Sequence, residues 1–368
     1  MRLLQLVAGE KWTGAAAVVY DQTAALVASG FEAQFGFVRD SPLSRRLLPL
    51  GWARPLLSRP RWPLDYARDL RHLRETLERE KFDAVHCHLS HDHFLAAAAV
   101  RGTGIPLART FHNLAHVRND FVSRGLVRRT AAFAFANRAI AAKFDRAGPV
   151  LSPVVDSGRF RPGALPRERL ESLGVPAGAF IVGTVGKMAA GRGHAEAIAA
   201  VAALPAPAVM LHVGKGELRP TLETQAGELG AGARNFWAGY EEDGLPELYR
   251  AMDVLLFTAS GSEQGQRAIL EAMSSGVPVV ALDLPGVPDL LTHGREGLVV
   301  RQPTDLVAAL TRLRDSADER SGMAGRARER ALEFGPDRFA ARAREFYAGL
   351  PVRNSSTSRA WDAGETAG

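Results

Sequence analysis

Two glutamates with seven residues between them, Glu263 and Glu271, are the strongest candidates for chemistry in this chain of 368 residues. A short apolar run at 254–257 predicts a strand before them, and the following pattern predicts a helix beginning near Gly265 or Gln266. The first amides of a helix have no partner within it and suit a diphosphate. Glu271 lies two turns on, among apolar residues, where a buried carboxylate requires a polar partner such as ribose hydroxyls. The alternative is a helix-capping acid followed by a solvated glutamate.

A glycine-rich segment at 183–194 carries two cations, Lys187 and Arg192. Two cations match the charge of a pyrophosphate leaving group, above all where no metal shares that charge. Gly186 directly precedes Lys187 and belongs to the same predicted phosphate loop. The alternative is an ordinary strand-to-helix turn with surface cations.

Three predicted strands in the N-terminal half end in residues that can contact a ligand. Thr13 and Gly14 follow the first strand, and Gly14 would let the backbone come close to a phosphate. His88 and His112 each end a later strand. A histidine placed there can hydrogen-bond a sugar hydroxyl or the proton that leaves an acceptor, although lone histidines are more often structural.

Closely spaced histidines also raise the question of a metal, since His86, His88, His91 and His93 follow one another. No carboxylate or cysteine set completes such a site, so the sequence predicts no bound metal and no cofactor. The one cysteine, Cys87, has no partner for an internal disulfide and is predicted to be buried in a reducing cytosol.

The segment 260–280 resembles the donor site of retaining glycosyltransferases, those of family 4 in particular. The shared pattern is a glutamate, seven residues and a second glutamate that opens Glu-Ala-Met, a small pair, Gly and Pro-Val-Val. The resemblance implies that Glu263 contacts the transferred sugar and Glu271 the nucleoside ribose. Where the family usually has Glu-Gly-Phe-Gly, this chain has Glu263-Gln264-Gly265-Gln266, which leaves the donor sugar open.

The resemblance covers nearly the whole chain outside 41–61. It implies that Lys187 and Arg192 hold the diphosphate, in exchanged order relative to the family. It further implies a set of donor-side and acceptor-side residues: Gly14, Gly186, Gly214, Gly216, Gly239, Tyr240, Gln264, Gly265 and Gln266 on the donor side, and Thr13 and His88 on the acceptor side. His112 is implied to be catalytic together with Glu263 and the two cations. Plain turns remain the alternative for the pair Gly214 and Gly216.

The fold expected from the resemblance is α/β of the GT-B type, two Rossmann-like doubly wound parallel sheets facing a central cleft. Strand–helix alternation along both halves agrees with it. The expected domains are an acceptor-side domain at 1–155 and a nucleotide-sugar donor domain at 156–334. A helix at 335–350 is expected to return to the first domain, and a disordered tail to follow at 351–368. A single long helix is predicted at 124–142.

Charge is unevenly distributed over a net +6. Up to Pro153 there are 22 Lys and Arg against 13 Asp and Glu, and six arginines fall within 39–61 against the single acid Asp40. Leucines and tryptophans are interleaved, as on surfaces that contact anionic lipid headgroups. The alternative is a solvated insertion loop broken by prolines. Nucleic acid is not an expected partner, because no recognised motif accompanies the charge.

The sequence therefore predicts a cytoplasmic, metal-independent, retaining glycosyltransferase, because no signal peptide or membrane span is recognised. Its donor is expected to be a nucleotide-diphosphate sugar and its acceptor a cell-envelope glycan or lipid-linked molecule of the lipopolysaccharide type. Peripheral contact with the inner membrane face through 39–62 is a further expectation. A nucleotide-sugar epimerase or hydrolase of the same architecture and a non-catalytic nucleotide-sugar binding protein remain the alternatives.

Overall fold

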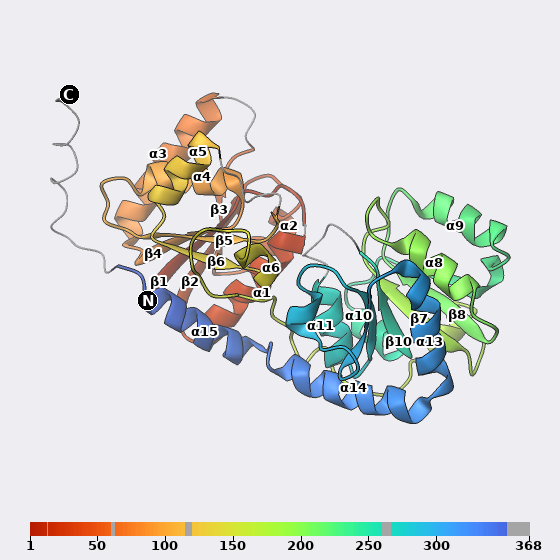
Figure 1. Ribbon diagram of the computed structural model, residues 1–368. Coiled ribbons are helices and arrows are strands. Elements are labelled where there is room, and N and C mark those ends of the chain that lie inside the picture. The colour runs from red at the N-terminus through yellow and green to blue at the C-terminus, as the bar shows by residue number, and fades with distance from the viewer. Residues whose placement is uncertain (13, 60–62, 115–119, 260–265, 352–368) are drawn as a thin grey trace. The chain divides into compact units, whose positions relative to one another are not determined.

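The computed structural model describes residues 1–12, 14–59, 63–114, 120–259 and 266–351. The chain forms two compact units, drawn in Figure 1. One unit comprises Met1–Pro153 together with the chain from Pro336 onward, and the other comprises Val154–Gly335. The last helix, α15 (Pro336–Ala348), therefore belongs to the N-terminal unit. The predicted tail at 352–368 lies outside the described residues.

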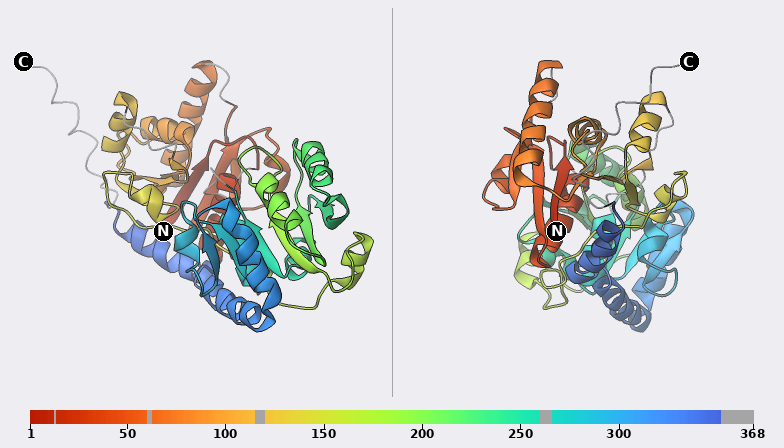
Figure 2. Two further views of the ribbon diagram at one scale, coloured as in Figure 1. Left: turned by 45° about the vertical axis from the view of Figure 1, so that its right-hand side comes forward. Right: turned by 90° about the vertical axis from the view of Figure 1, so that its left-hand side faces the viewer.

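The N-terminal unit is built on a parallel sheet of six described strands in the order β3-β2-β1-β4-β5-β6. Its strands are β1 Arg2–Val7, β2 Glu32–Val38, β3 Ala53–Leu57, β4 Ala84–Cys87, β5 Leu107–Phe111 and β6 Ala132–Phe135. Its other helices are α1 Gly14–Ala28, α2 Ser44–Leu47, α3 Pro63–Glu80, α4 Ser90–Ala99, α5 Phe121–Arg128 and α6 Arg138–Ala141. Helices α3 and α4 cover one face, and α1, with α15 beside it, covers the other (Figures 1 and 2).

The C-terminal unit repeats this architecture, with the described strand order β12-β11-β10-β7-β8-β9. Its strands are β7 Phe180–Val185, β8 Ala208–Val213, β9 Asn235–Gly239, β10 Val254–Phe257, β11 Val279–Leu282 and β12 Gly297–Val300. Its helices are α7 Arg167–Ser172, α8 His194–Ala202, α9 Arg219–Glu228, α10 Leu245–Arg250, α11 Gln266–Ser274, α12 Val287–Leu290, α13 Leu306–Asp315 and α14 Ala317–Leu332, with short 3₁₀ turns at Gly232–Arg234 and Pro303–Asp305.

Each sheet reverses its strand order next to its first strand, between β1 and β4 and between β7 and β10. In open α/β sheets the loops that follow the strands on either side of such a reversal separate and leave a crevice at the carboxyl edge, where ligands bind. In the C-terminal unit the loop after β7 carries Lys187 and Arg192, and the chain after β10 continues into α11, which carries Glu271. Both of the strongest sequence motifs therefore follow strands that flank a reversal point.

The single helix predicted at 124–142 is wrong. Strand β6 lies in its middle, between α5 and α6. Phe133 and Phe135 are buried in an apolar cluster, and the strand pairs with β5 in register. Alanine-rich sequence favours a helix locally, but the burial of alternating phenylalanines on the sheet outweighs that preference.

The basic segment is not the insertion loop that was expected. Within 39–59 the chain forms α2 and then β3, which pairs with β2 at the edge of the sheet. Its buried apolar side chains are Leu43, Leu47, Leu56 and Leu57. Arg54 pairs with Glu80, and Arg46 lies 4.1 Å over the ring of Trp12. Most of the leucines in this segment therefore stabilise the core, whereas Leu48 is exposed.

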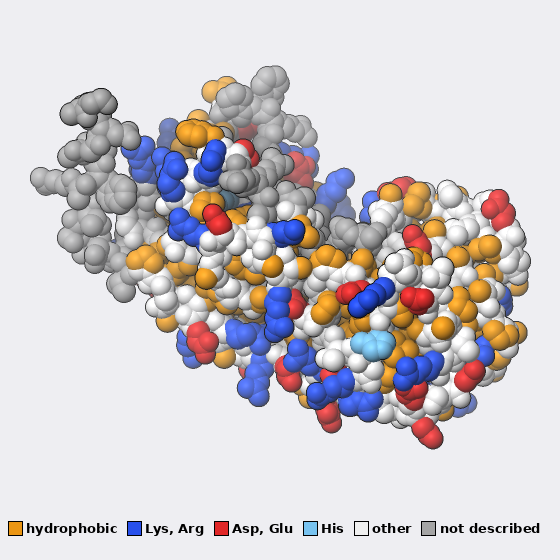
Figure 3. Space-filling model, viewed as in Figure 1, with side chains coloured by type: hydrophobic (Ala, Val, Ile, Leu, Met, Phe, Trp, Pro, Cys, Tyr) orange, Lys and Arg blue, Asp and Glu red, His pale blue; other side chains and the backbone are white. Residues whose placement is uncertain are grey.

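No helix in the described part of the chain is both long enough and apolar enough to cross a bilayer. On the face drawn in Figure 3, lysines and arginines are spread among apolar and polar side chains rather than gathered into one patch.

Candidate functional site

The loop from β7 to α8 is held against the end of β10. Gly193 caps α8 with φ of 71°, and a Cβ added there would lie 2.2 Å from the carbonyl oxygen of Thr258. The Thr258 hydroxyl donates to the Gly193 carbonyl at 2.7 Å. A side chain at position 193 would force the two loops apart, so this glycine sets the position of the neighbouring Arg192.

Arg192 and Lys187 occupy different environments in this loop. Arg192 is half-buried, burial lowers its guanidinium pKa, and no described carboxylate pairs with it. Lys187 is more than half exposed and its Nζ lies 2.9 Å from Glu217 Oε2. A cation that is partly removed from water without an acid beside it is prepared for an anionic ligand. Of the two predicted cations, Arg192 is the better prepared to bind phosphate.

The glycines after β8 are required by close backbone packing, which the sequence did not reveal. A Cβ at Gly214 would lie 1.9 Å from the Gly186 carbonyl oxygen, and a Cβ at Gly216 would lie 2.1 Å from that of Met188. Their absent side chains make room for the backbone of the β7–α8 loop. Gly214 also donates its amide to the Gly239 carbonyl at 2.7 Å. These residues pack three loops together at one sheet edge.

Tyr240 follows Gly239 and is exposed, with the Lys215 ammonium 4.8 Å from its ring centroid. Gly186 lies in open space, because nothing described would meet a Cβ there within 4 Å. Gly186 and Tyr240 are therefore accessible in this unit, whereas Gly214 and Gly216 face backbone.

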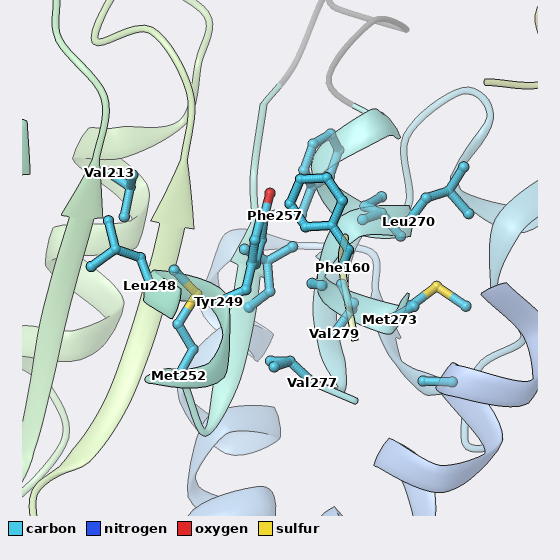
Figure 4. Close-up of a cluster of buried hydrophobic side chains, with 14 of the residues drawn as sticks. Phe160, Val213, Leu248, Tyr249, Met252, Phe257, Leu270, Met273, Val277 and Val279 are labelled. Atoms are coloured by element: carbon cyan, nitrogen blue, oxygen red, sulfur yellow. The ribbon is translucent and has the colours of Figure 1, made fainter. Parts of the chain in front are cut away.

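Helix α11 begins at Gln266, as the sequence predicts, and carries Glu271 on its buried side. The polar partners that a buried carboxylate requires are supplied at Glu271 by the protein itself. Tyr249 donates its hydroxyl to Oε2 at 2.9 Å, and Arg267 Nε lies 2.9 Å from Oε1. Burial raises the pKa of Glu271 and Arg267 opposes that rise. Figure 4 shows Tyr249 among apolar side chains with its hydroxyl directed away from Met252 and Val277.

Gln266 is also buried, and its amide nitrogen donates to the Pro285 carbonyl at 2.9 Å. Its Oε1 has no hydrogen-bond partner among the described residues. Four of the predicted site residues, Thr13, Glu263, Gln264 and Gly265, lie outside the described residues.

In the N-terminal unit His88 and His112 lie directly after β4 and β5 and are buried together. His88 Nδ1 is 2.9 Å from His112 Nε2, and His88 Nε2 is 2.7 Å from Gln5 Oε1. Gly14 opens α1, next to the first strand. The structure therefore joins the two predicted histidines in one hydrogen-bonded group.

Sequence reasoning missed a buried ion pair beneath these strands. Arg109 and Asp92 are both almost fully buried, with Arg109 Nη1 3.3 Å from Asp92 Oδ1. Asp92 also accepts from the amides of Ala8, His88 and Leu89. One signal was available, since an arginine within the apolar pattern of β5 demands a buried partner.

No group of three His, Cys, Asp or Glu side chains in the described ranges lies close enough to hold a metal ion. His86, which opened the question of a metal, contacts Tyr347 and Thr110 instead. His93 contacts the hydroxyl of Thr130.

Buried neutral histidines make the N-terminal unit sensitive to acid. Burial lowers the pKa of His93 to about 3, whereas an unfolded histidine titrates near 6.5. Below pH 6.5 the unfolded chain takes up a proton that the folded chain refuses, so stability falls as pH falls. When the pH falls from 7.5 to 5.5, we expect the free energy of unfolding of the wild type to fall by about 1.4 kcal/mol more than that of His93→Gln.

Urea denaturation at the two pH values measures this difference. His72→Gln is the control, because His72 is only partly buried on α3. Equal acid losses in wild type and His93→Gln would show that His93 is not held neutral.

Comparison with known proteins adds family information to this geometry. Residues 179–316 match the family model described as Glycosyl transferases group 1, and residues 12–147 match the one described as Glycosyltransferase Family 4. D-inositol 3-phosphate glycosyltransferase of Salinispora arenicola is 30% identical over 298 residues, covering 70% of this chain and 66% of the relative. The chain thus spans just under two thirds of that relative.

A second relative, 2-deoxystreptamine N-acetyl-D-glucosaminyltransferase of Streptomyces fradiae, is 36% identical over 163 residues, covering 42% of this chain and 38% of the relative. Among solved structures, Anabaena HepE in complex with UDP-glucose has a TM-score of 0.79 at 20% identity, covering 95% of this chain and all of that one. A glycosyltransferase from Rickettsia africae has a TM-score of 0.81 at 17% identity, covering 94% of this chain and 97% of that one. These likenesses confirm the predicted GT-B fold.

Proposed function

Because the chain belongs to the glycosyltransferases of family 4 and group 1, we propose that it transfers a sugar from a nucleotide-diphosphate donor to an acceptor hydroxyl. The donor site is in the C-terminal unit, at the crevice between the loops after β7 and β10. Transfer retains the anomeric configuration, and the leaving phosphate takes the acceptor proton.

The observation that carries this proposal is the state of Arg192. Its guanidinium is half-buried at the β7–α8 loop, and no described acid neutralises it. Glycosidic bond cleavage places negative charge on the leaving diphosphate, and a preorganised cation stabilises that charge most where water is excluded. Lys187 adds a second cation when phosphate displaces Glu217 from it. The two cations would supply the charge stabilisation for which other transferases use a metal.

Glu271 supports the nucleoside part of the donor. Tyr249 and Arg267 occupy one lone pair on each carboxylate oxygen and hold the group in place. A carboxylate has about four acceptor positions, so two remain for the ribose hydroxyls. UDP-glucose is the first donor to test, since Anabaena HepE has been solved with it.

The acceptor side is proposed to use His112, with His88 behind it. A cell-envelope glycan or lipid-linked molecule of the lipopolysaccharide type is one acceptor class. A small polyol or phosphorylated cyclitol is the second, and it is favoured by the relatives named for inositol 3-phosphate and 2-deoxystreptamine. Contact with an anionic membrane would depend on exposed arginines, because the apolar residues of the basic segment are largely internal.

The experiment begins with a thermal-shift panel of nucleotide sugars, since a tight ligand raises the melting temperature. The stabilising donor is then incubated with inositol phosphates, aminocyclitols and lipid-linked glycans, with and without EDTA. We expect a product of retained configuration by NMR and no loss of rate in EDTA. Sugar released at the same rate without acceptor would identify a hydrolase, and an isomerised donor would identify an epimerase.

Glu271→Gln tests the ribose contact. The amide oxygen can still accept from Tyr249, but the charge that strengthens hydrogen bonds to hydroxyls is lost. We expect the dissociation constant for the nucleotide to rise about tenfold to a hundredfold by calorimetry. Glu319→Gln, on the surface of α14, serves as the control. Unchanged affinity would remove Glu271 from the donor site.

A further inference from the structure

Six buried polar side chains form one continuous hydrogen-bonded chain inside the N-terminal unit. Thr110 Oγ1 lies 2.8 Å from His86 Nε2, and His86 Nδ1 lies 2.6 Å from the Tyr347 hydroxyl. Gln5 Nε2 donates to that hydroxyl at 2.7 Å, and Gln5 Oε1 lies 2.7 Å from His88 Nε2. His88 Nδ1 in turn lies 2.9 Å from His112 Nε2.

The side-chain amide of Gln5 fixes which groups donate and which accept along this hydrogen-bonded chain. Its nitrogen is a donor only and its oxygen an acceptor only, so His88 must carry its proton on Nε2. The other nitrogen of neutral His88, Nδ1, is then an acceptor, and His112 must donate to it from Nε2. In neutral His112 the lone pair therefore falls on Nδ1.

The other arm of the hydrogen-bonded chain is compatible with this orientation of Gln5. Tyr347 has one proton, and burial raises the pKa of its hydroxyl, so it remains a donor. It donates to His86 Nδ1 and accepts from the Gln5 nitrogen. His86 in turn donates from Nε2 to Thr110. Tyr347 belongs to α15, which packs beside α1 (Figure 1). The last helix of the polypeptide therefore helps to orient a residue of the first strand.

We propose that Gln5 is a positioning residue that acts through His88 to hold His112 as the neutral tautomer protonated on Nε2, with Nδ1 as a hydrogen-bond acceptor. Tyr347 secures the amide of Gln5. The role rests on the proposed function, in which His112 interacts with the acceptor hydroxyl. Histidines that bind or move protons depend on such a partner at the second ring nitrogen for their tautomer.

Burial and the charges around these hydrogen-bonded side chains favour the neutral form of the histidines. Burial lowers the pKa of His88 well below its ordinary value, and His86, His112 and Arg109 lower it further. Burial likewise lowers the pKa of His86 to about 3. Asp92, which accepts from the backbone amide of His88, is paired with Arg109. A carboxylate in place of the Gln5 amide would instead favour the protonated, positively charged form of His88.

Transfer assays with three variants test the role. Gln5→Met removes both hydrogen bonds at similar volume, and we expect kcat to fall about tenfold to a hundredfold with KM for the donor unchanged. Gln5→Glu accepts only, draws a proton onto His88 and turns His88 Nδ1 into a donor facing His112. We expect a similar fall in kcat and a pH optimum shifted upward. Tyr347→Phe is expected to lower kcat by about tenfold or less.

Two controls match these changes. Gln22→Met removes a buried glutamine that is not part of the hydrogen-bonded chain and donates to the carbonyls of Leu151 and Ser152. Tyr66→Phe removes a hydroxyl on α3, where the ring packs on Phe94. Both controls are expected to keep kcat within about threefold of wild type. Wild-type kcat in Gln5→Met would overturn the positioning role.

Nitrogen-15 NMR of the histidine rings tests the tautomers without any activity. We expect His112 and His88 of the wild type to be neutral and protonated on Nε2 at pH 7.5, with assignments from His112→Gln and His88→Gln. In Gln5→Met the His112 signals should move toward a mixture of tautomers. A His112 protonated on Nδ1 in the wild type would overturn the proposal, even where transfer is observed. If no nucleotide sugar is transferred at all, the proposed function fails, and the NMR result still decides on the hydrogen-bonded chain.

Discussion

Arg192→Ala is expected to lower kcat/KM for sugar transfer about a thousandfold, equivalent to about 4 kcal/mol of transition-state stabilisation. Arg192 is half-buried, and Gly193 next to it is held against Thr258, whose hydroxyl donates to the Gly193 carbonyl at 2.7 Å. Its charge therefore requires no reorganisation when the diphosphate leaves, and a half-buried charge is screened less by water than an exposed one. Steady-state kinetics with the donor identified by thermal shift measure the effect.

Related variants separate charge from geometry. Arg192→Lys keeps a cation but loses the planar pair of donors, so part of the activity should return. Lys187→Ala should cost less than Arg192→Ala, because Lys187 is exposed and pairs with Glu217 in the absence of donor. Arg312→Ala is the control, since Arg312 is exposed on α13 and pairs with Glu319. An Arg192→Ala enzyme within tenfold of wild type would rule out this loop as the diphosphate site.

Arg109→Met is expected to lower the free energy of unfolding by about 3–5 kcal/mol. Arg109 and Asp92 are both buried, and removing the guanidinium leaves a carboxylate without its cation in a low-dielectric interior. The amides of Ala8, His88 and Leu89 still donate to Asp92, but they carry no full charge to compensate it. Urea denaturation monitored by circular dichroism measures the loss.

A double-mutant cycle tests the physical reason. Asp92→Asn combined with Arg109→Met removes both charges, so the double variant should be more stable than the sum of the two single losses implies. The matched surface variant is Arg219→Met, whose partner Glu223 lies one turn along an exposed face of α9, and it should cost less than about 1 kcal/mol. Additive losses in the buried cycle would mean that the two charges do not stabilise each other.

Much of the architecture was predictable because alternating short apolar runs and amphipathic stretches are local signals. The strand at 254–257 is confirmed at its predicted position, and α11 (Gln266–Ser274) follows it where a helix was predicted. Predictions were wrong where local preference and tertiary burial disagree. The alanine-rich segment at 124–142 contains β6, and the arginine-rich segment contains the edge strand β3.

The candidate site was likewise predictable only in part. Residue types at strand ends identified Arg192, His88 and His112 as candidates, since parallel strands bring their carboxyl ends to one edge. Their partners did not follow from spacing. The sequence indicated that a buried Glu271 requires a polar partner, but it did not identify Tyr249, 22 positions away, as that partner.

By itself the sequence determined the strand–helix alternation outside β3 and β6, the family and the segments that carry the candidate chemistry, because periodicity and short motifs are properties of neighbouring residues. Tertiary structure alone decided which groups meet. Gln5 contacts Tyr347 across 342 positions, Arg109 faces Asp92, and Gly214 gives space to the backbone of Gly186. Such pairings depend on strand order, register and the path of the last helix, and a linear pattern does not contain the distances between elements that only packing brings together.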